Sequence, residues 1–150
     1  MAGYGENGGL NGRFNITKQD SANFMQFLAA EAQGRAVAIG LKNAAEIIGR
    51  VLPLVQFSVN EQCVAGQECS HFQAFTQAGK PVFHIEYPNG DDSSSTPVDD
   101  TTGWCKTETQ DDGHTYDISN FSTVIKNMNL DGWVQLCDGS TAVTPTSNAR

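Results

Sequence analysis

The sequence predicts an α/β domain in which parallel strands alternate with helices. Segments with the helical spacing of apolar residues alternate along the chain with short apolar runs that are typical of buried strands. Strict alternation of this kind indicates parallel strands with helices packed on the sheet. The four strands expected from the 150 residues form either an open doubly wound sheet or half of a (β/α)₈ barrel, because a whole barrel needs roughly 250 residues.

The first helix and the first strand follow a start rich in glycine and asparagine. Thr17 with Asp20 three residues later is a capping-box pattern, and it predicts a helix that runs to Gly34. The apolar residues expected on one face of this helix are Phe24, Phe27 and Leu28. Residues 36–41 form a short continuous apolar run, which predicts a strand buried on both faces.

The second helix and strand are predicted by the same signals. Asn43 with Glu46 is another capping-box pattern, and the apolar residues from 44 to 51 have helical spacing. Pro53 stops this helix because proline has no backbone N–H to donate. Residues 54–60 are then expected to form the second strand.

The third helix is expected to begin at Ser70, which forms a capping-box pattern with Gln73. Phe72 and Phe75 supply its apolar face, and Gly79-Lys80-Pro81 is a typical end of a helix. The third strand is expected at once after it, over residues 82–87.

The last third of the chain begins with a segment without periodicity. Residues 88–116 are expected to form a long exposed loop, because they hold many acids and one base, Lys106. The acids are Asp91, Asp92, Asp99, Asp100, Glu108, Asp111 and Asp112. Helical spacing returns over 118–128, and residues 132–137 predict the fourth strand. We therefore divide the chain into one domain, 1–138, and a flexible tail, 139–150.

Composition excludes several classes of function. Nine Lys and Arg against 17 Asp and Glu give a net charge of −8 and a pI near 4.6. Nucleic acids and anionic membranes need a concentrated positive face, so neither is expected as a partner. The sequence has no apolar run long enough to span a bilayer. It also lacks the P-loop, the dinucleotide fingerprint, the serine-hydrolase elbow and the His-Glu-x-x-His motif.

The cysteines and the N-terminus point to different compartments. Four cysteines and two glycosylation sequons, at Asn15 and Asn120, favour a secreted and oxidised protein. The first residues carry neither the basic nor the apolar region of a signal peptide. We therefore expect a piece of a longer extracellular protein, against a cytosolic protein with reduced thiols.

The cysteine spacing allows a metal site or a disulfide. Cys63 and Cys69 with His71 nearby would suggest a metal site with His84 as a further ligand, but structural zinc sites space their cysteines two to four residues apart. A local disulfide that closes the loop after Glu61 is favoured. Spacing alone does not choose between the three connectivities of four cysteines. If the local bridge forms, the second joins Cys105 to Cys137.

Polar residues cluster where the predicted strands end. Functional groups of parallel α/β folds gather at the carboxyl ends of strands, because the loops there converge on one edge. The residues in these positions are Lys42, Asn43, Asn60, Glu61, Gln62, Glu86 and Tyr87, with Gln135 and Asp138 beside the fourth strand. Lys42 would pair with Glu61 or Glu86, and any of these residues can also be an inert surface or loop side chain.

Glu61 is the strongest candidate for chemistry. A general acid or base needs a carboxylate in a partly dry cleft with a second carboxylate across the substrate. In a regular strand Glu61 shares a face with Phe57 and Val59, whereas Asn60 shares the other face with Ser58. A bulge or an early strand end would then be required to turn Glu61 into a cleft.

Three segments resemble one family of enzymes. Gly40-Leu41-Lys42-Asn43, Val59-Asn60-Glu61-Gln62-Cys63 with Cys69, and Gly79-Lys80-Pro81-Val82-Phe83 with Glu86-Tyr87 occur in the same order as in family 114 of the glycoside hydrolases. This family comprises endo-α-1,4-polygalactosaminidases, and the similarity is to the C-terminal half of its fungal secreted form. It covers Gly3 to about Cys137.

The resemblance implies a (β/α)₈ barrel that hydrolyses α-1,4-linked galactosamine polymers with two acidic residues and without a metal or other cofactor. One acid maps onto Glu61, and Lys42, Asn43, Asn60, Gln62, Glu86 and Tyr87 are the expected substrate-binding residues. The second acid belongs to an Asp-rich segment upstream of the equivalent of Gly3-Tyr4, so a further N-terminal half-barrel is expected as a partner. The substrate is a polycation, which an acidic protein attracts.

Three functions follow in order of preference. The first is the glycoside hydrolase, and the second is an inactive fragment that binds carbohydrate through groups such as Tyr87 and Trp104. The third is an open α/β protein unrelated to sugars. A second carboxylate, upstream or on a partner chain, separates the first function from the second.

Overall fold

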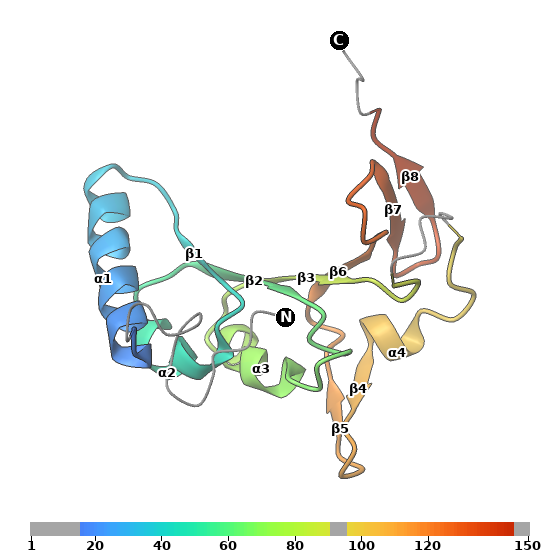
Figure 1. The fold of residues 1–150 in the computed structure, drawn as a ribbon, viewed down its shortest axis with the longest axis horizontal. Coiled ribbons are helices and arrows are strands. Elements are labelled where there is room, and N and C mark those ends of the chain that lie inside the picture. The colour runs from blue at the N-terminus through green and yellow to red at the C-terminus, as the bar shows by residue number, and fades with distance from the viewer. Residues whose placement is uncertain (1–15, 91–95, 146–150) are drawn as a thin grey trace.

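The computed structural model describes residues 16–90 and 96–145, and they form a twisted sheet with helices on one side (Figure 1). The helices are α1 (Lys18–Gly34), the 3₁₀ turn η2 (Ala45–Ile47), α2 (Ile48–Val51), α3 (Cys69–Gln77) and α4 (Thr102–Cys105). The strands are β1 (Gly40–Lys42), β2 (Phe57–Glu61), β3 (Val82–Glu86), β4 (Thr107–Thr109), β5 (Thr115–Asp117), β6 (Ser122–Ile125), β7 (Trp133–Leu136) and β8 (Thr141–Val143). Within these residues, no helix has the length and apolarity that crossing a membrane requires.

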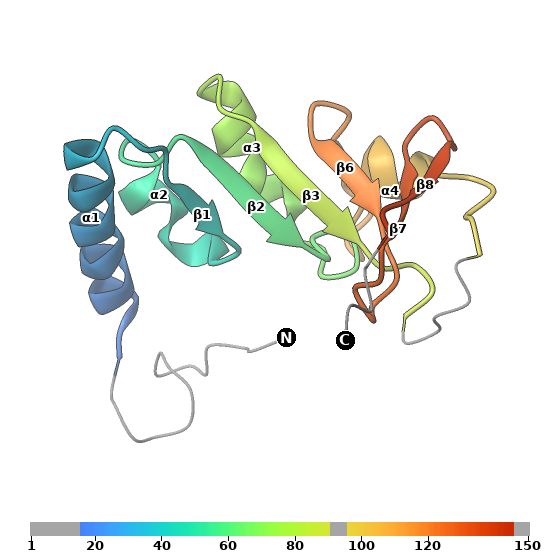
Figure 2. The same ribbon diagram turned by 90° about the horizontal axis from the view of Figure 1, so that it is seen from above.

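The main sheet has the strand order β1-β2-β3-β6-β7-β8. The first four strands are parallel, and their arrowheads point to the same edge in Figure 2. β7 continues the sheet antiparallel to β6, and β8 is in turn antiparallel to β7. The expected α/β fold with four parallel strands is therefore present, and β1, β2 and β3 lie within a few residues of their predicted positions.

The fourth parallel strand differs from the prediction. Residues 118–128 were expected to form a helix, but residues 122–125 form β6. Thr123, Val124 and Ile125 are β-branched and favour a strand, and their burial alternates along it. Ile118 and Phe121 contributed to the apparent helical spacing. They lie in the turn that precedes the strand, and both are buried there. The strand expected at 132–137 exists as β7, but it is antiparallel.

The acidic segment and the tail also carry regular structure. Residues 88–116, expected to be an exposed loop, contain α4 and most of the β4–β5 hairpin, so that part of the prediction is wrong. Residues 141–143 lie in the segment expected to be a flexible tail, and they pair with β7 as β8. Asp91 and Asp92 lie outside the described residues.

The helix starts agree with the sequence prediction in one case of three. Thr17 and Asp20 form the expected capping box of α1, with each side chain bonded to the other residue's backbone N–H. Asn43 and Ser70 do not cap helices. Asn43 has a positive φ of 52° and its side chain bonds to β2, while α3 already begins at Cys69.

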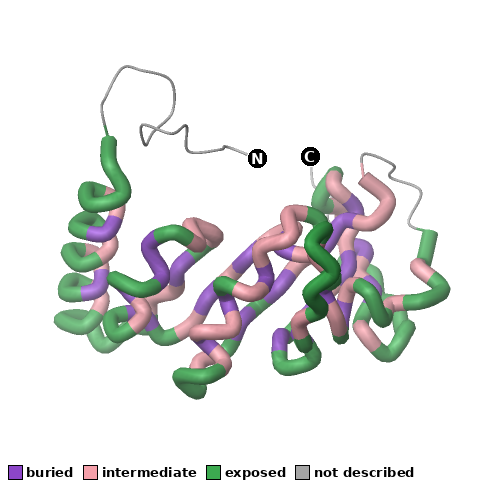
Figure 3. The backbone as a smooth tube through the Cα atoms, turned by 90° about the horizontal axis from the view of Figure 1, so that it is seen from below, coloured by how far each residue is buried: buried purple, intermediate pink, exposed green. Residues whose placement is uncertain are grey.

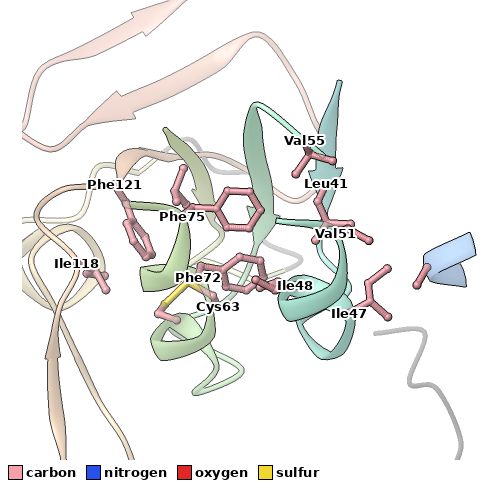
Figure 4. Close-up of a cluster of buried hydrophobic side chains, with 13 residues drawn as sticks. Leu41, Ile47, Ile48, Val51, Val55, Cys63, Phe72, Phe75, Ile118 and Phe121 are labelled. Atoms are coloured by element: carbon pink, nitrogen blue, oxygen red, sulfur yellow. A yellow bond between two sulfur atoms is a disulfide. The ribbon is translucent and has the colours of Figure 1, made fainter. Parts of the chain in front are cut away.

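The core lies between the sheet and its helices. Side chains of α2 and α3 pack on one face of β1, β2 and β3, with Phe72 and Phe75 at the centre (Figure 4). The tube coloured by burial shows α1 largely exposed (Figure 3). This helix packs through Ala22 and Ala29, so Phe24 and Phe27, which were expected on its packed face, are 60% and 58% exposed.

The opposite face of the parallel sheet is not covered by a helix of the described residues (Figure 1). Phe57 and Phe83 lie on it with their rings edge to face at 5.7 Å, and Phe83 is 44% exposed. Gly40 leaves room for the Phe57 ring beside it, because a Cβ there would meet this ring at 2.1 Å unless the ring moved. We call this the open face of the sheet.

Candidate active site

Glu61 ends β2 at the edge toward which the four parallel strands point. The strand is regular to its last residue, so its side chains alternate between the two faces. Asn60 is fully buried against the helices, whereas the Glu61 side chain is on the open face and 35% exposed. The strand therefore presents Glu61 without the bulge that the sequence led us to consider.

Lys42, the last residue of β1, and Asn43, the first residue after it, hold Glu61. Lys42 Nζ lies 3.0 Å from Glu61 Oε1, which confirms one of the two expected ion pairs of this lysine. The Glu61 N–H donates to Asn43 Oδ1 at 3.0 Å, and the Asn43 N–H donates to the Val59 carbonyl at 2.8 Å. Because both members of the ion pair are more than a third exposed, it adds at most about 1 kcal/mol to stability. Its main effect is to orient the carboxylate.

Tyr87 and Gln62 complete this edge of the sheet. Tyr87 follows β3 and is 8% exposed. Burial raises the pKa of its phenol, and the charges of Glu61 and Glu86 raise it further, so the hydroxyl keeps its proton and can donate a hydrogen bond. Gln62 is half-buried with a positive φ of 61°, and its N–H donates to the Ile85 carbonyl at 2.8 Å.

Asn60 and Glu86 do not lie beside Glu61 on the open face. Both are fully buried on the face that the helices cover. The expectation that they contact substrate does not fit this position, because a substrate on the open face would be separated from them by the sheet. Strand alternation explains the difference, since each is one residue away from a position that faces the open side.

Glu86 instead fixes the backbone of the loop that follows Glu61. Its Oε1 accepts the N–H of Val64 at 2.7 Å and lies 2.7 Å from His84 Nε2. His84 is also fully buried, with Nδ1 2.9 Å from Thr123 Oγ1 on β6. The two side chains share a face because they are two residues apart in β3. Sequence reasoning missed this pair, although the His-x-Glu spacing within a strand was the available signal.

The same loop is closed by the predicted disulfide. Cys63 and Cys69 are bonded with a Cα–Cα distance of 4.8 Å, and Cys105 is bonded to Cys137, so both predicted bridges are present. His84 does lie close to the first bridge, with Nε2 3.3 Å from Cys63 Sγ. The two sulfurs are nevertheless bonded to each other and not available as thiolate ligands, and His71 is exposed and outside the cluster.

The β4–β5 hairpin holds the outer side of this loop. Glu108, expected in an exposed loop, is fully buried, and its Oε1 accepts the Cys69 N–H at the start of α3. At the hairpin's turn, Gln67 and Asp111 exchange two hydrogen bonds, of 2.7 and 2.8 Å. Residues 62–69, which we call the Glu61 loop, are thus fixed by a disulfide and by two buried carboxylates.

Gln135 lies level with the edge that carries Glu61, whereas Asp138 does not. Gln135 pairs with Ile125, the last residue of β6, and Ile125 pairs with Glu86 at the end of β3. Because β7 is antiparallel, the chain from Gln135 to Asp138 runs toward the opposite edge. Gln135 is buried and its amide bonds to both the N–H and the carbonyl of Val98. Its role is to attach the acidic segment to the sheet.

The chain matches one family of enzymes over nearly its whole length. The model of glycoside-hydrolase family GH114 matches residues 1–142. Among solved structures, the crystal structure of Aspergillus fumigatus Ega3 in complex with galactosamine is similar, with 44% identity and a TM-score of 0.74. The match covers 85% of this chain and 49% of that chain, so this chain spans about half of that relative's length. No protein of curated function matches. The coverage fits the expected half of a (β/α)₈ barrel.

Proposed function

Since the chain belongs to glycoside-hydrolase family GH114, we propose that it is part of an endo-α-1,4-polygalactosaminidase in which Glu61 is one of two catalytic carboxylates. The observation that carries this proposal is the position of Glu61. It is a partly exposed carboxylate at the carboxyl end of a parallel strand, on the open face. Barrel enzymes carry their catalytic groups at such strand ends.

Glu61 is proposed to act as the general acid. Hydrolysis of a glycosidic bond requires one carboxyl group to protonate the departing oxygen while a second carboxylate acts on the other side of the sugar. Because Glu61 forms an ion pair with Lys42 in this structure, the scheme requires Glu61 to take up a proton before the step, and the Lys42 ammonium 3.0 Å away then stabilises the negative charge that the proton transfer leaves. The second carboxylate is expected in an N-terminal half-barrel, and no metal or other cofactor is required by this scheme.

Substrate binding is proposed for the residues that surround Glu61 on its own edge. Lys42 is the last residue of β1. The first residues after β1, β2 and β3 are Asn43, Gln62 and Tyr87. The Tyr87 hydroxyl is protonated at neutral pH, as a phenol ordinarily is, and burial raises its pKa further, so it is a donor for a sugar oxygen. Galactosamine is present in the crystal of the similar protein, which supports an amino sugar as the substrate here.

The charge of the protein supports a cationic polysaccharide. A galactosamine polymer with free amines carries a positive charge on each unit, and the chain has a net charge of −8. Such a charge difference raises the local substrate concentration and weakens with salt. The protein is proposed to act outside the cell, and its two disulfides support an oxidising compartment.

The test compares two polymers with the full-length protein. We expect hydrolysis of α-1,4-linked galactosamine polymer with free amines, with a KM that rises as salt is added, and much slower hydrolysis of the fully N-acetylated polymer. Release of oligosaccharides is the measurement. Equal rates on both polymers would contradict the cationic substrate, and no hydrolysis of either would contradict the enzyme.

The chain alone is expected to bind the polymer without cleaving it. The alternative function, a carbohydrate-binding fragment without activity, describes this case. It is favoured by one observation, namely that Glu86, which was expected to bind substrate at this edge, is fully buried on the helix-covered face and so does not oppose Glu61 across a substrate. Cleavage by the isolated chain would show that the second carboxylate lies within it.

A further inference from the structure

We propose that Asn120 carries an N-linked glycan. The sequon Asn120-Phe121-Ser122 has the required hydroxyl residue at its third position and no proline at its second. Such motifs are common by chance, so the sequon alone is weak. The local structure of these three residues supports the proposal.

Asn120 lies at the tip of a tight turn between β5 and β6. The Phe121 N–H donates to the Ile118 carbonyl at 2.9 Å, which closes the turn, and the Ser119 N–H donates to Asp117 Oδ1 at 2.9 Å. Ile118 and Phe121 are buried and anchor both sides of the turn, while Ser119 and Asn120 between them are exposed. The turn therefore presents the Asn120 side chain to solvent on a fixed backbone.

The groups that take part in the modification are unengaged in the folded protein. Neither the Asn120 amide nor the Ser122 hydroxyl makes a hydrogen bond to another of the described residues, and both residues are exposed. The other sequon differs, because the Thr17 hydroxyl both donates to and accepts from Asp20 in the capping box of α1. Asn15 itself lies outside the described residues.

A glycan at Asn120 would leave the proposed active site open. Ser122 begins β6 and pairs with Phe83, the second residue of β3, at the amino ends of the parallel strands. Glu61 lies at the carboxyl end of β2 (Figure 2). The turn and Glu61 are thus on opposite edges of the sheet, and a bulky solubilising group at the turn would not compete with the Glu61 loop for space.

The modification has a defined chemistry. The donor is an oligosaccharide linked to a lipid through a diphosphate. The bond between the first sugar's C1 and the diphosphate oxygen breaks, a bond forms between C1 and Asn120 Nδ2, and one Nδ2 proton is lost as the lipid diphosphate leaves. The oxidised cysteines of this chain are consistent with passage through the compartment where such transfer takes place.

The test expresses the full-length protein with a secretory leader in a eukaryotic host. Protein is collected from the medium and, where it is retained, from the secretory lumen of the same cells. Peptide-N-glycosidase digestion in heavy-oxygen water converts each glycosylated asparagine to a labelled aspartate, which peptide mass spectrometry locates. We expect the label at residue 120 in most of the protein.

Three variants make the assignment specific. Asn120→Gln and Ser122→Ala should each remove the label at 120, and Asn15→Gln should leave it unchanged. The two substituted side chains at the turn are exposed and unbonded, so both variants should fold. A predominantly unmodified Asn120 in protein whose two disulfides have formed would overturn the proposal, as would a label at 120 that survives Ser122→Ala.

Discussion

Two glutamates one strand apart have opposite environments because of their positions in their strands. Glu61 is on the open face, where a substrate can reach it, whereas Glu86 is fully buried and bonded to Val64 and His84. The first is suited to chemistry. The second is suited to fixing the Glu61 loop, since a buried carboxylate needs partners and finds them in the loop's backbone.

Replacing the buried glutamate should destabilise the protein. Glu86→Gln keeps the size of the side chain but replaces the carboxylate, which accepts the Val64 N–H and contacts His84, with a neutral amide. We expect a loss of about 1–3 kcal/mol in the free energy of unfolding, measured with urea. Glu46→Gln is the matched control, because Glu46 is exposed, and it should change this free energy by less than about 0.5 kcal/mol. Equal effects of the two substitutions would contradict the role of Glu86.

At the scale of elements, the Glu61 loop is held from several directions. Its disulfide closes it, β3 supplies Glu86, and the β4–β5 hairpin supplies Glu108 and Asp111. The β4–β5 hairpin, although distant in sequence, thus helps to fix the conformation of the loop that follows β2. This arrangement predicts that the two disulfides matter for different properties.

The two bridges should rank oppositely in stability and activity. The loop-entropy relation gives about 4 kcal/mol for Cys105–Cys137, with a sequence separation of 32, and about 2 kcal/mol for Cys63–Cys69, with a sequence separation of 6. Paired alanine substitutions of Cys105 and Cys137 should therefore lower stability more. Paired alanine substitutions of Cys63 and Cys69 should lower hydrolysis by the full-length protein more, because that bridge closes the Glu61 loop. Urea unfolding and rate measurements on the two variants test both rankings, and the reverse order in either would contradict the assignment.

Helix α1 should depend on pH through its capping box. The side-chain hydrogen bond from Thr17, followed by the backbone hydrogen bond from Thr17, lowers the pKa of Asp20 below its ordinary value of 3.8. A pKa that is lower in the folded state means that Asp20 stabilises the fold above pH 3.8 and loses this effect as the pH falls through its folded pKa. Asp20→Asn should thus be destabilising at pH 6 and progressively less so as the pH is lowered below 3.8, as measured by urea unfolding. A destabilisation that is unchanged at low pH would contradict this.

The elements that sequence reasoning predicted well are those with local signals. The capping box at Thr17 and Asp20 predicted α1, and the helix ends at Pro53 and at Gly79-Lys80-Pro81 placed the strands that follow them, β2 and β3, closely. β6 was missed because its four residues are too few to show alternation, and the buried turn residues Ile118 and Phe121 imitate helical spacing. Pairing direction depends on partners distant in sequence, so the antiparallel β7 had no local signal.

The candidate site was predictable in its position but not in its orientation. Asn43 and Glu61 were expected near each other at strand ends, and they are bonded. Which residues of a strand end face the open side depends on where the strand ends, and this the sequence did not determine. Asn60 and Glu86 were assigned to the site for that reason, and they lie on the helix-covered face.

At the scale of the whole molecule, the open face is the feature that determines whether the chain associates in solution. Phe83 is 44% exposed on it, and Phe24 and Phe27 are exposed on α1. Exposed apolar surface and unpaired strand edges promote association. The N-terminal half-barrel that we expect as a partner would cover such a face.

The isolated chain is therefore expected to associate in solution. Light scattering should give a mass above 16.1 kDa, and Phe83→Ser should shift it toward the monomer. The same measurement on the full-length protein is the control, and it should show less association per chain. A stable, sharply melting monomer of the isolated chain would show instead that its strands form a self-sufficient sheet.

The central claim is that Glu61 is an essential carboxylate of a hydrolase for galactosamine polymers. Glu61→Gln keeps the volume of the side chain and removes the transferable proton. In the full-length protein, we expect it to lower hydrolysis of the free-amine polymer by at least ~10²-fold, with an unchanged circular dichroism spectrum, while Glu46→Gln keeps the wild-type rate. Near wild-type turnover by the correctly folded Glu61→Gln variant would contradict the claim.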